Sequence, residues 1–84
     1  MKSTKTATKV KRILSQLSGA KRISASDSLK DRLLLDSLAL VTLLVEIEDT
    51  LGVRLSDEDM DPFSLETAGD VIALAERVGG EQNG

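Results

Sequence analysis

Hydrophobic residues recur at helical spacing in three stretches of the chain. The first stretch, residues 4–18, has four apolar residues at i, i+3, i+4 and i+7: Val10, Ile13, Leu14 and Leu17. The second stretch spans residues 37–51 and the third residues 67–78, and both repeat this period. Because such spacing forms one face of an amphipathic helix, the pattern predicts an all-α fold. Thr67 and Asp70 have the spacing of a capping box, which places the start of the last helix.

The segments between these stretches predict the rest of the bundle. Gly19 can adopt the left-handed conformation that ends a helix, so residues 19–36 are expected to form a long loop. A short third helix is expected over residues 57–64, with Phe63 and Leu65 holding it on the core. We therefore expect a four-helix bundle with a long loop between its first two helices.

The whole chain, residues 1–84, is expected to form one domain, because this length supports a single modest core. Its last residues, 79–84, begin with two glycines that stop the final helix and are expected to form a tail. A monomer is expected.

The second helical stretch is apolar on two faces. One face carries the spacing expected of core residues: Leu40, Leu43, Leu44, Ile47 and Leu51. Almost opposite lies a second apolar set that leads toward two acids: Leu38, Val41 and Val45, then Glu48 and Asp49. A small domain cannot easily bury both faces, so the second face is expected to dock a partner. The stretch is too short and too charged to cross a membrane.

Asp36 and Ser37 stand where this helix begins, because both residue types are favoured at helix starts. The pattern thus presents an exposed hydroxyl nucleophile, that of Ser37, beside an apolar strip. We take Ser37 as the candidate functional residue.

Composition argues against catalysis by the chain itself. It has no cysteine and no histidine, which removes thiolate metal sites and the commonest general base. The acidic segment 57–61 lacks the glycine-punctuated ligand loop of a calcium site, so we expect no metal. With 84 residues the chain is also too short for a deep catalytic cleft, and we expect it not to be an enzyme.

Charge is unevenly distributed. Residues 1–35 hold nine Lys and Arg against two acids, or +7, whereas residues 36–84 hold two Arg against twelve acids, or −10. The acidic half would attract basic partner surfaces. Nucleic-acid binding is not expected, because this half repels phosphate and Phe63 is the only aromatic residue. No apolar run of signal-peptide length follows the N-terminal lysines, so we expect no membrane anchor and a cytoplasmic protein.

The residues around Ser37 resemble a known family. Asp36-Ser37-Leu38, the apolar helix with its acidic end, and the motif of residues 51–55, LGVRL, are similar to the acyl, peptidyl and aminoacyl carrier proteins. The resemblance covers Leu29 to Val78. It implies that Ser37 carries a 4'-phosphopantetheine arm whose thiol holds the cargo as a thioester, and that Asp36 assists the modification.

The same resemblance implies the partners of the chain. They are a phosphopantetheinyl transferase, a ligase that loads an acyl or aminoacyl cargo, and downstream synthase or transferase enzymes acting in trans. The residues expected to dock them are those of the second face, Leu38, Val41, Val45, Glu48 and Asp49.

Three positions depart from the family's usual pattern. Leu34 stands where many acyl carriers have glycine. The Leu-Leu-Asp-Ser segment, residues 34–37, is closer to that of D-alanyl and other aminoacyl carriers. Ala39 and Thr42 are neutral where fatty-acid carriers place acids. These departures favour a specialised biosynthetic pathway, aminoacyl or peptidyl or secondary-metabolite acyl, over bulk fatty-acid synthesis. The alternative is an unmodified helical interaction module that docks through Leu38, Val41 and Val45, with Ser37 only capping the helix.

Overall fold

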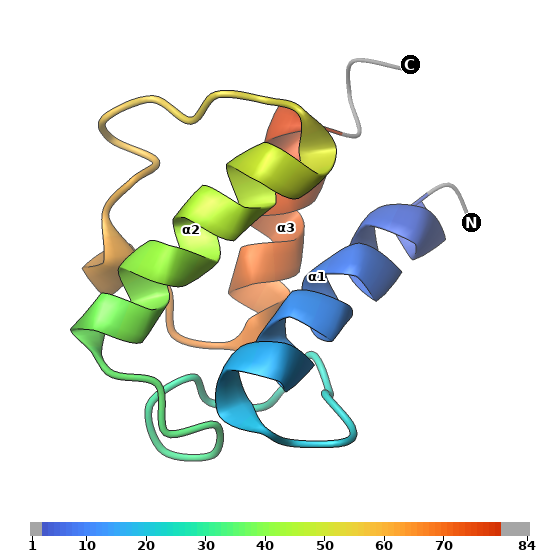
Figure 1. Ribbon diagram of the computed structural model, residues 1–84, viewed down its shortest axis with the longest axis vertical. Helices are drawn as coiled ribbons and strands as arrows, with labels where there is room; N and C mark the ends of the chain where they lie inside the picture. The colour runs from blue at the N-terminus through green and yellow to red at the C-terminus, as the bar shows by residue number, and fades with distance from the viewer. Residues whose placement is uncertain (1–2, 80–84) are drawn as a thin grey trace.

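The structure, a computed structural model, describes residues 3–79, and within them three α-helices are joined by two long connections (Figure 1). The helices are α1 (Ser3–Ser18), α2 (Ser37–Leu51) and α3 (Ala68–Val78), and a single 3-10 turn, η1 (Pro62–Ser64), precedes α3. Helices α2 and α3 both contact α1. The all-α class expected from the hydrophobic pattern is confirmed.

The expected third helix over residues 57–64 is wrong in extent. Hydrogen-bonded turns cover residues 57–60, and the only helical segment here is η1. The reason is Pro62, which has no amide hydrogen and disfavours a helical conformation in the residue before it. Asp61 is accordingly extended, and its carboxylate accepts a hydrogen bond from the Phe63 amide at 3.0 Å.

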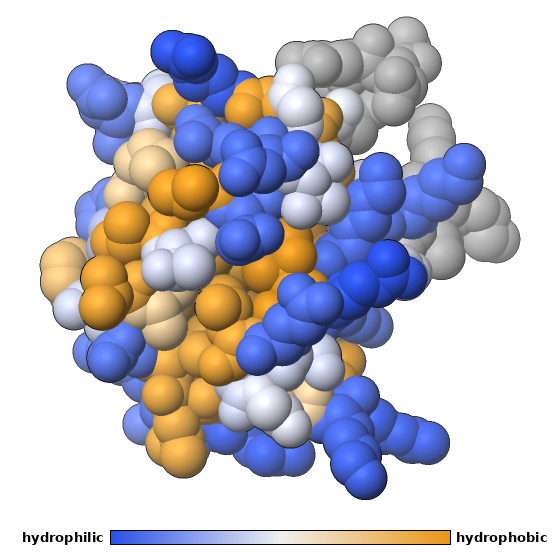
Figure 2. Space-filling view, in the orientation of Figure 1, coloured by the Kyte–Doolittle hydropathy of each residue, from blue (hydrophilic) through white to orange (hydrophobic). Residues whose placement is uncertain are grey.

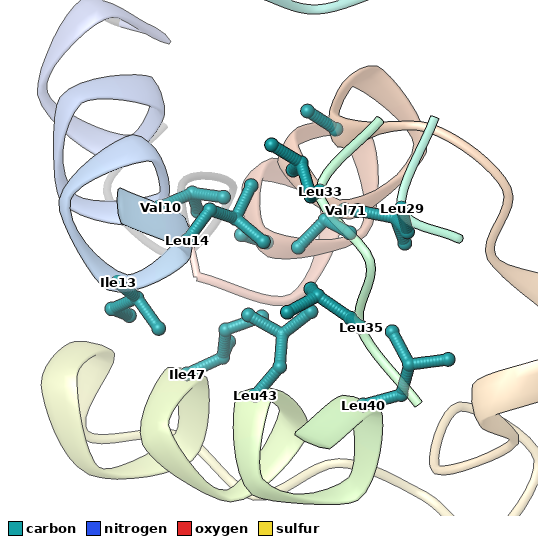
Figure 3. Packing of buried hydrophobic residues seen from close by; sticks show 12 residues of the cluster. Val10, Ile13, Leu14, Leu29, Leu33, Leu35, Leu40, Leu43, Ile47 and Val71 are labelled. Atoms are coloured by element: carbon teal, nitrogen blue, oxygen red, sulfur yellow. The ribbon is translucent and has the colours of Figure 1, made fainter. Parts of the chain in front are cut away.

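The core lies where α1, α2, α3 and the first connection meet (Figure 3). The inner face of α2 points into it through Leu40, Leu43 and Ile47, all buried, as the helical spacing predicted. Opposite them stand buried residues of the other elements, among them Val10, Leu14, Leu29, Leu33, Leu35 and Val71. A smaller cluster of Leu44, Leu55 and Leu74 packs the second connection onto α2 and α3. The outer face of α2 is therefore left for contacts other than core packing.

Backbone hydrogen bonds tie the first connection, residues 19–36, to the start of α3. The Leu29 amide donates to the Glu66 carbonyl, and the Ala68 amide to the Asp27 carbonyl, both at 2.9 Å. The Gly69 amide donates to the Ala25 carbonyl at 2.8 Å, and a Cβ on Gly69 would stand 3.0 Å from that oxygen. Glycine is favoured there because a Cβ would make a tight contact where the two backbones approach closely. The loop that leads to Ser37 is thus fixed in place.

Two carboxylates secure the second connection to α3. Asp70 completes the expected capping box with Thr67, and its pKa is lowered chiefly because the backbone amide of Glu66 donates to the carboxylate. The Arg77 guanidinium donates to Asp59 at 2.7 Å and holds the pKa of that carboxyl below its usual value. The expected tail, 79–84, lies beyond the described residues from position 80 onward.

Candidate functional site

Two adjacent residues at the start of helix α2 have different roles. Asp36 is the N-cap: its backbone is extended, and its carboxylate accepts a hydrogen bond from the Ala39 amide at 2.8 Å. Its carbonyl accepts the first helical bond, from the Leu40 amide at 2.9 Å. Ser37 follows as the first residue of the helix. The cap is therefore supplied by Asp36.

The Ser37 side chain has no structural role in the described part of the chain. It is exposed, and within residues 3–79 its hydroxyl takes part in no hydrogen bond. The alternative in which Ser37 only caps the helix is wrong in this respect, because the capping oxygen belongs to Asp36. A solvent-facing hydroxyl without a partner is available as a nucleophile.

The surroundings of Ser37 fit an attached phosphodiester. The first turn of a helix presents unpaired amide hydrogens and the positive end of the helix dipole, both of which favour a nearby phosphate. No bulky group would have to be displaced, because Ser37 and the neighbouring Leu38 are both exposed. The residues present thus fit a 4'-phosphopantetheine group on the Ser37 oxygen.

An apolar strip runs along α2 away from Ser37. Leu38 is 73% exposed, and Val41 and Val45 follow at 41% and 42%. They recur three and four residues apart, so they share one face of the helix. Figure 2 shows hydrophobic side chains gathered over α2, whereas α1 presents mainly hydrophilic ones. The structure therefore brings together the three apolar residues that the sequence assigned to docking.

The two acids of the expected docking set differ from each other. Asp49 is exposed. Glu48 is half-buried, and its carboxylate accepts a hydrogen bond from the Leu55 amide at 2.7 Å. Glu48 thus holds the chain after Gly52 against α2. The position of Glu48 in the sequence did not indicate this contact.

Sequence reasoning missed the exposure of two apolar residues outside α2. Phe63, expected together with Leu65 to hold a short helix on the core, is 72% exposed on η1, so the expectation is wrong for Phe63, whereas Leu65 is half-buried and packs against the core. Leu34 is 78% exposed and has a φ of 58°, in the left-handed region. No signal in the Leu33-Leu34-Leu35 run marks the middle leucine as exposed, because the left-handed conformation of Leu34 depends on hydrogen bonds that its neighbours make to other loop residues.

A surface hollow of about 390 Å³ opens beside the first turn of α2. Its lining comes from the first connection, α2 and the segment around η1, and includes Lys30, Leu40 and Phe63. Leu40 lies three residues after Ser37, about one helical turn along α2. The hollow is therefore near the candidate attachment point.

Two further features bear on the chemistry available. Among residues 3–79, no group of three or more Asp or Glu side chains is arranged to hold a metal ion. In the same described range, no helix is long and apolar enough to cross a membrane.

Comparison with known proteins agrees with this geometry. The family model described as the phosphopantetheine attachment site matches residues 8–75. A meromycolate extension acyl carrier protein of Mycobacterium tuberculosis is 39% identical over 56 residues, which are 67% of this chain and 47% of the relative. An acyl carrier protein of Rhodococcus erythropolis is 36% identical over 59 residues, or 70% of this chain and 63% of the relative. The chain thus spans about half the length of the mycobacterial relatives.

Solved structures share the fold over nearly the whole chain. An acyl carrier protein from Thermotoga maritima superposes with a TM-score of 0.76 at 22% identity, covering 100% of this chain and 96% of the other. A provisionally named acyl carrier protein from Mycobacterium tuberculosis gives a TM-score of 0.66 at 29% identity, covering 92% and 97%.

Proposed function

Because the chain belongs to the phosphopantetheine-binding acyl carrier protein family, we propose that Ser37 is its attachment residue and that the loaded protein presents a thioester cargo to partner enzymes in the cytoplasm. The observation that supports this most directly is the exposed, unpartnered Ser37 hydroxyl directly after the Asp36 cap. The attached group would supply the thiol on which the cargo is held. The chain supplies the attachment point and the docking surface, and partner enzymes supply the catalysis.

The chemistry of attachment is a phosphoryl transfer performed by a separate transferase. The Ser37 oxygen attacks the phosphorus of coenzyme A that bears the pantetheine. The bond from this phosphorus to the adenosine half breaks, and adenosine 3',5'-bisphosphate leaves while a base of the transferase takes the serine proton. Magnesium bound in the transferase offsets the phosphate charge. In this step Asp36 keeps the first turn formed and places a carboxylate beside Ser37.

Docking follows from the exposed face of α2. Leu38, Val41 and Val45 would enter apolar pockets of a partner, and buried apolar anchors supply most of the affinity of an interface. Asp49 would meet basic residues at the rim, which chiefly raises the association rate and the selectivity. We assign Glu48 a smaller share in docking, because its carboxylate already holds the Leu55 amide.

The class of cargo is the finer part of the proposal. The mycobacterial relatives are named for meromycolate extension, which favours an acyl cargo in a specialised lipid pathway. The Leu-Leu-Asp-Ser segment that leads into α2 favours an aminoacyl cargo instead. We propose the acyl cargo, because the relatives share 39% of 56 residues with this chain. The resemblance of the Leu-Leu-Asp-Ser segment to aminoacyl carriers rests on only a few positions.

The test is the intact mass of the protein before and after incubation with coenzyme A, magnesium and a promiscuous phosphopantetheinyl transferase. We expect a gain of one phosphopantetheine, which Ser37→Ala abolishes. Ser26→Ala is the matched control, because Ser26 is also exposed but lies in the first connection. No gain with any of several transferases would overturn the proposal and favour an unmodified module that binds a partner through Leu38, Val41 and Val45.

A further inference from the structure

Leu34 occupies a backbone conformation that leucine disfavours. Its φ of 58° makes it the only residue other than glycine with a positive φ among residues 3–79. The other two positive-φ positions are Gly19 and Gly52, and at both a Cβ would have open space. Glycine is kept at those two positions because of φ and not because of crowding. At the third left-handed position the chain has a leucine instead.

The fold needs the left-handed turn but does not need the leucine side chain. Leu33 and Leu35, on either side, are buried in the core. Their amides are fixed by hydrogen bonds to the Ser28 and Leu29 carbonyls, at 2.9 and 2.8 Å, so the backbone between them has little freedom. The Leu34 side chain points away from that core and is largely exposed. Glycine or asparagine would suit this position better on both counts.

Leu34 also lies close in the chain to the candidate attachment residue. It comes three residues before Ser37, and the exposed Leu38 comes one residue after it, so exposed leucines flank Ser37 on both sides. A strained, solvent-exposed apolar residue next to a functional site is best explained by a contact made outside the chain. We propose that Leu34 is a specificity-determining residue, received in an apolar pocket of the phosphopantetheinyl transferase that modifies Ser37.

The transferase is favoured as the occupant by the position of the reacting atom. Phosphoryl transfer takes place at the Ser37 oxygen itself, so the transferase must close over the residues on both sides of it. Enzymes that act later react with the thiol at the far end of a long arm and can dock further along α2. This inference rests on the proposed attachment at Ser37.

The test compares two variants that lose both the strain and the apolar side chain with a third that keeps both, and it reads strain from thermal unfolding and apolar contact from loading kinetics. Leu34→Gly and Leu34→Asn relieve the strain and remove the apolar side chain, whereas Leu34→Met keeps both. Phe63→Ser is the matched control, because it removes a similarly exposed apolar side chain from η1. Each purified apo protein is loaded with coenzyme A and magnesium by the transferase that modifies the parent chain most efficiently, and its thermal unfolding is recorded.

We expect Leu34→Gly and Leu34→Asn to unfold at a higher Tm, by about 4 to 8 °C, because the strain is gone. Their kcat/KM for loading falls about tenfold through KM with kcat unchanged, because a docking anchor is lost. Leu34→Met and Phe63→Ser load like the parent.

Loading of Leu34→Gly as efficient as that of the parent would overturn the inference while leaving Ser37 as the attachment residue. An equal loss in Phe63→Ser would also overturn it, since general surface hydrophobicity would then explain the effect. A parent chain that no transferase loads would overturn the attachment proposal and this inference together.

Discussion

At the scale of single residues, Asp36 combines two properties that substitution can separate. Its carboxylate caps α2 through the Ala39 amide at 2.8 Å, and it places a negative charge beside Ser37. Asparagine caps a helix about as well as aspartate, whereas alanine does not. We expect Asp36→Ala to lower the free energy of unfolding by about 0.5 to 2 kcal/mol and Asp36→Asn to leave it nearly unchanged, as measured by urea denaturation.

The loading kinetics of the same pair show whether the charge matters. If the Asp36 carboxylate assists modification, Asp36→Asn loses kcat for phosphopantetheine transfer despite its intact stability. If only the cap matters, Asp36→Asn loads like the parent. Asp36→Ala then loads more slowly, to the extent that the first turn of α2 is lost. Ser37→Ala, which removes no cap, should stay within about 0.5 kcal/mol of the parent in stability.

Glu48 is a second residue for which the structure adds a contact that its sequence-based assignment to docking did not include. Its carboxylate accepts a hydrogen bond from the amide of the buried residue Leu55 at 2.7 Å, so Glu48→Ala leaves that amide without a partner. We expect this variant to lose about 1 to 3 kcal/mol of unfolding free energy, and Glu48→Gln, which keeps an acceptor oxygen, to lose less. Urea denaturation of both variants measures the difference. Unchanged stability in Glu48→Ala, together with weaker transferase binding, would instead make Glu48 a docking residue.

At the scale of elements, α1 carries charges that oppose its own stability. Its first turn holds no acidic residue, although acids there complement the helix dipole. Lys5 and Lys9 lie four residues apart, so two like charges face each other on the exposed side. We expect Lys5→Glu to raise the free energy of unfolding by about 0.5 to 1 kcal/mol, because it adds a favourable dipole contact and an i,i+4 pair. The measurement is urea denaturation at low salt.

Lys5→Gln serves as the control, since it removes the repulsion without adding an acid and should give a smaller gain. High salt should reduce both gains, because exposed charges are screened. Equal stability of parent and Lys5→Glu at low salt would show that the charges of α1 are solvated too well to matter.

The helices were predictable because their signal is local. The stripes of α1, α2 and α3 and the capping box of Thr67 and Asp70 depend on residues within a few turns. The exposed side of Leu34 was not predictable, because its φ is set by hydrogen bonds that Leu33 and Leu35 make to other loop residues. The role of Glu48 was hidden for a similar reason, since its partner lies seven residues away across a helix end. Ser37 could thus be predicted as the candidate residue, whereas the surface around it could be predicted less fully.

At the scale of the whole molecule, a few polar contacts add to the apolar packing that holds the long connections to α3. The first connection is bonded through backbone atoms, which do not titrate. The second depends on two carboxylates whose pKa is lowered: Asp59, held by the Arg77 guanidinium, and Asp70, held by the Glu66 and Thr67 amides. Only the second attachment is therefore expected to weaken in acid.

The pH dependence of stability tests this difference. Because the folded pKa of Asp59 and of Asp70 lies below the ordinary value of 3.8, the unfolded chain takes up protons first as the pH falls. Their contribution is fully present above the unfolded pKa and is lost as the pH falls through the folded values. We expect the stability difference between the parent and a double variant, Asp59→Asn with Asp70→Asn, to shrink below about pH 4 in urea denaturation from pH 7 to 2.5. The other carboxylates are common to both proteins and cancel in the comparison. A difference that stays constant over this range would mean that the two side chains act as hydrogen-bond acceptors whose charge contributes nothing.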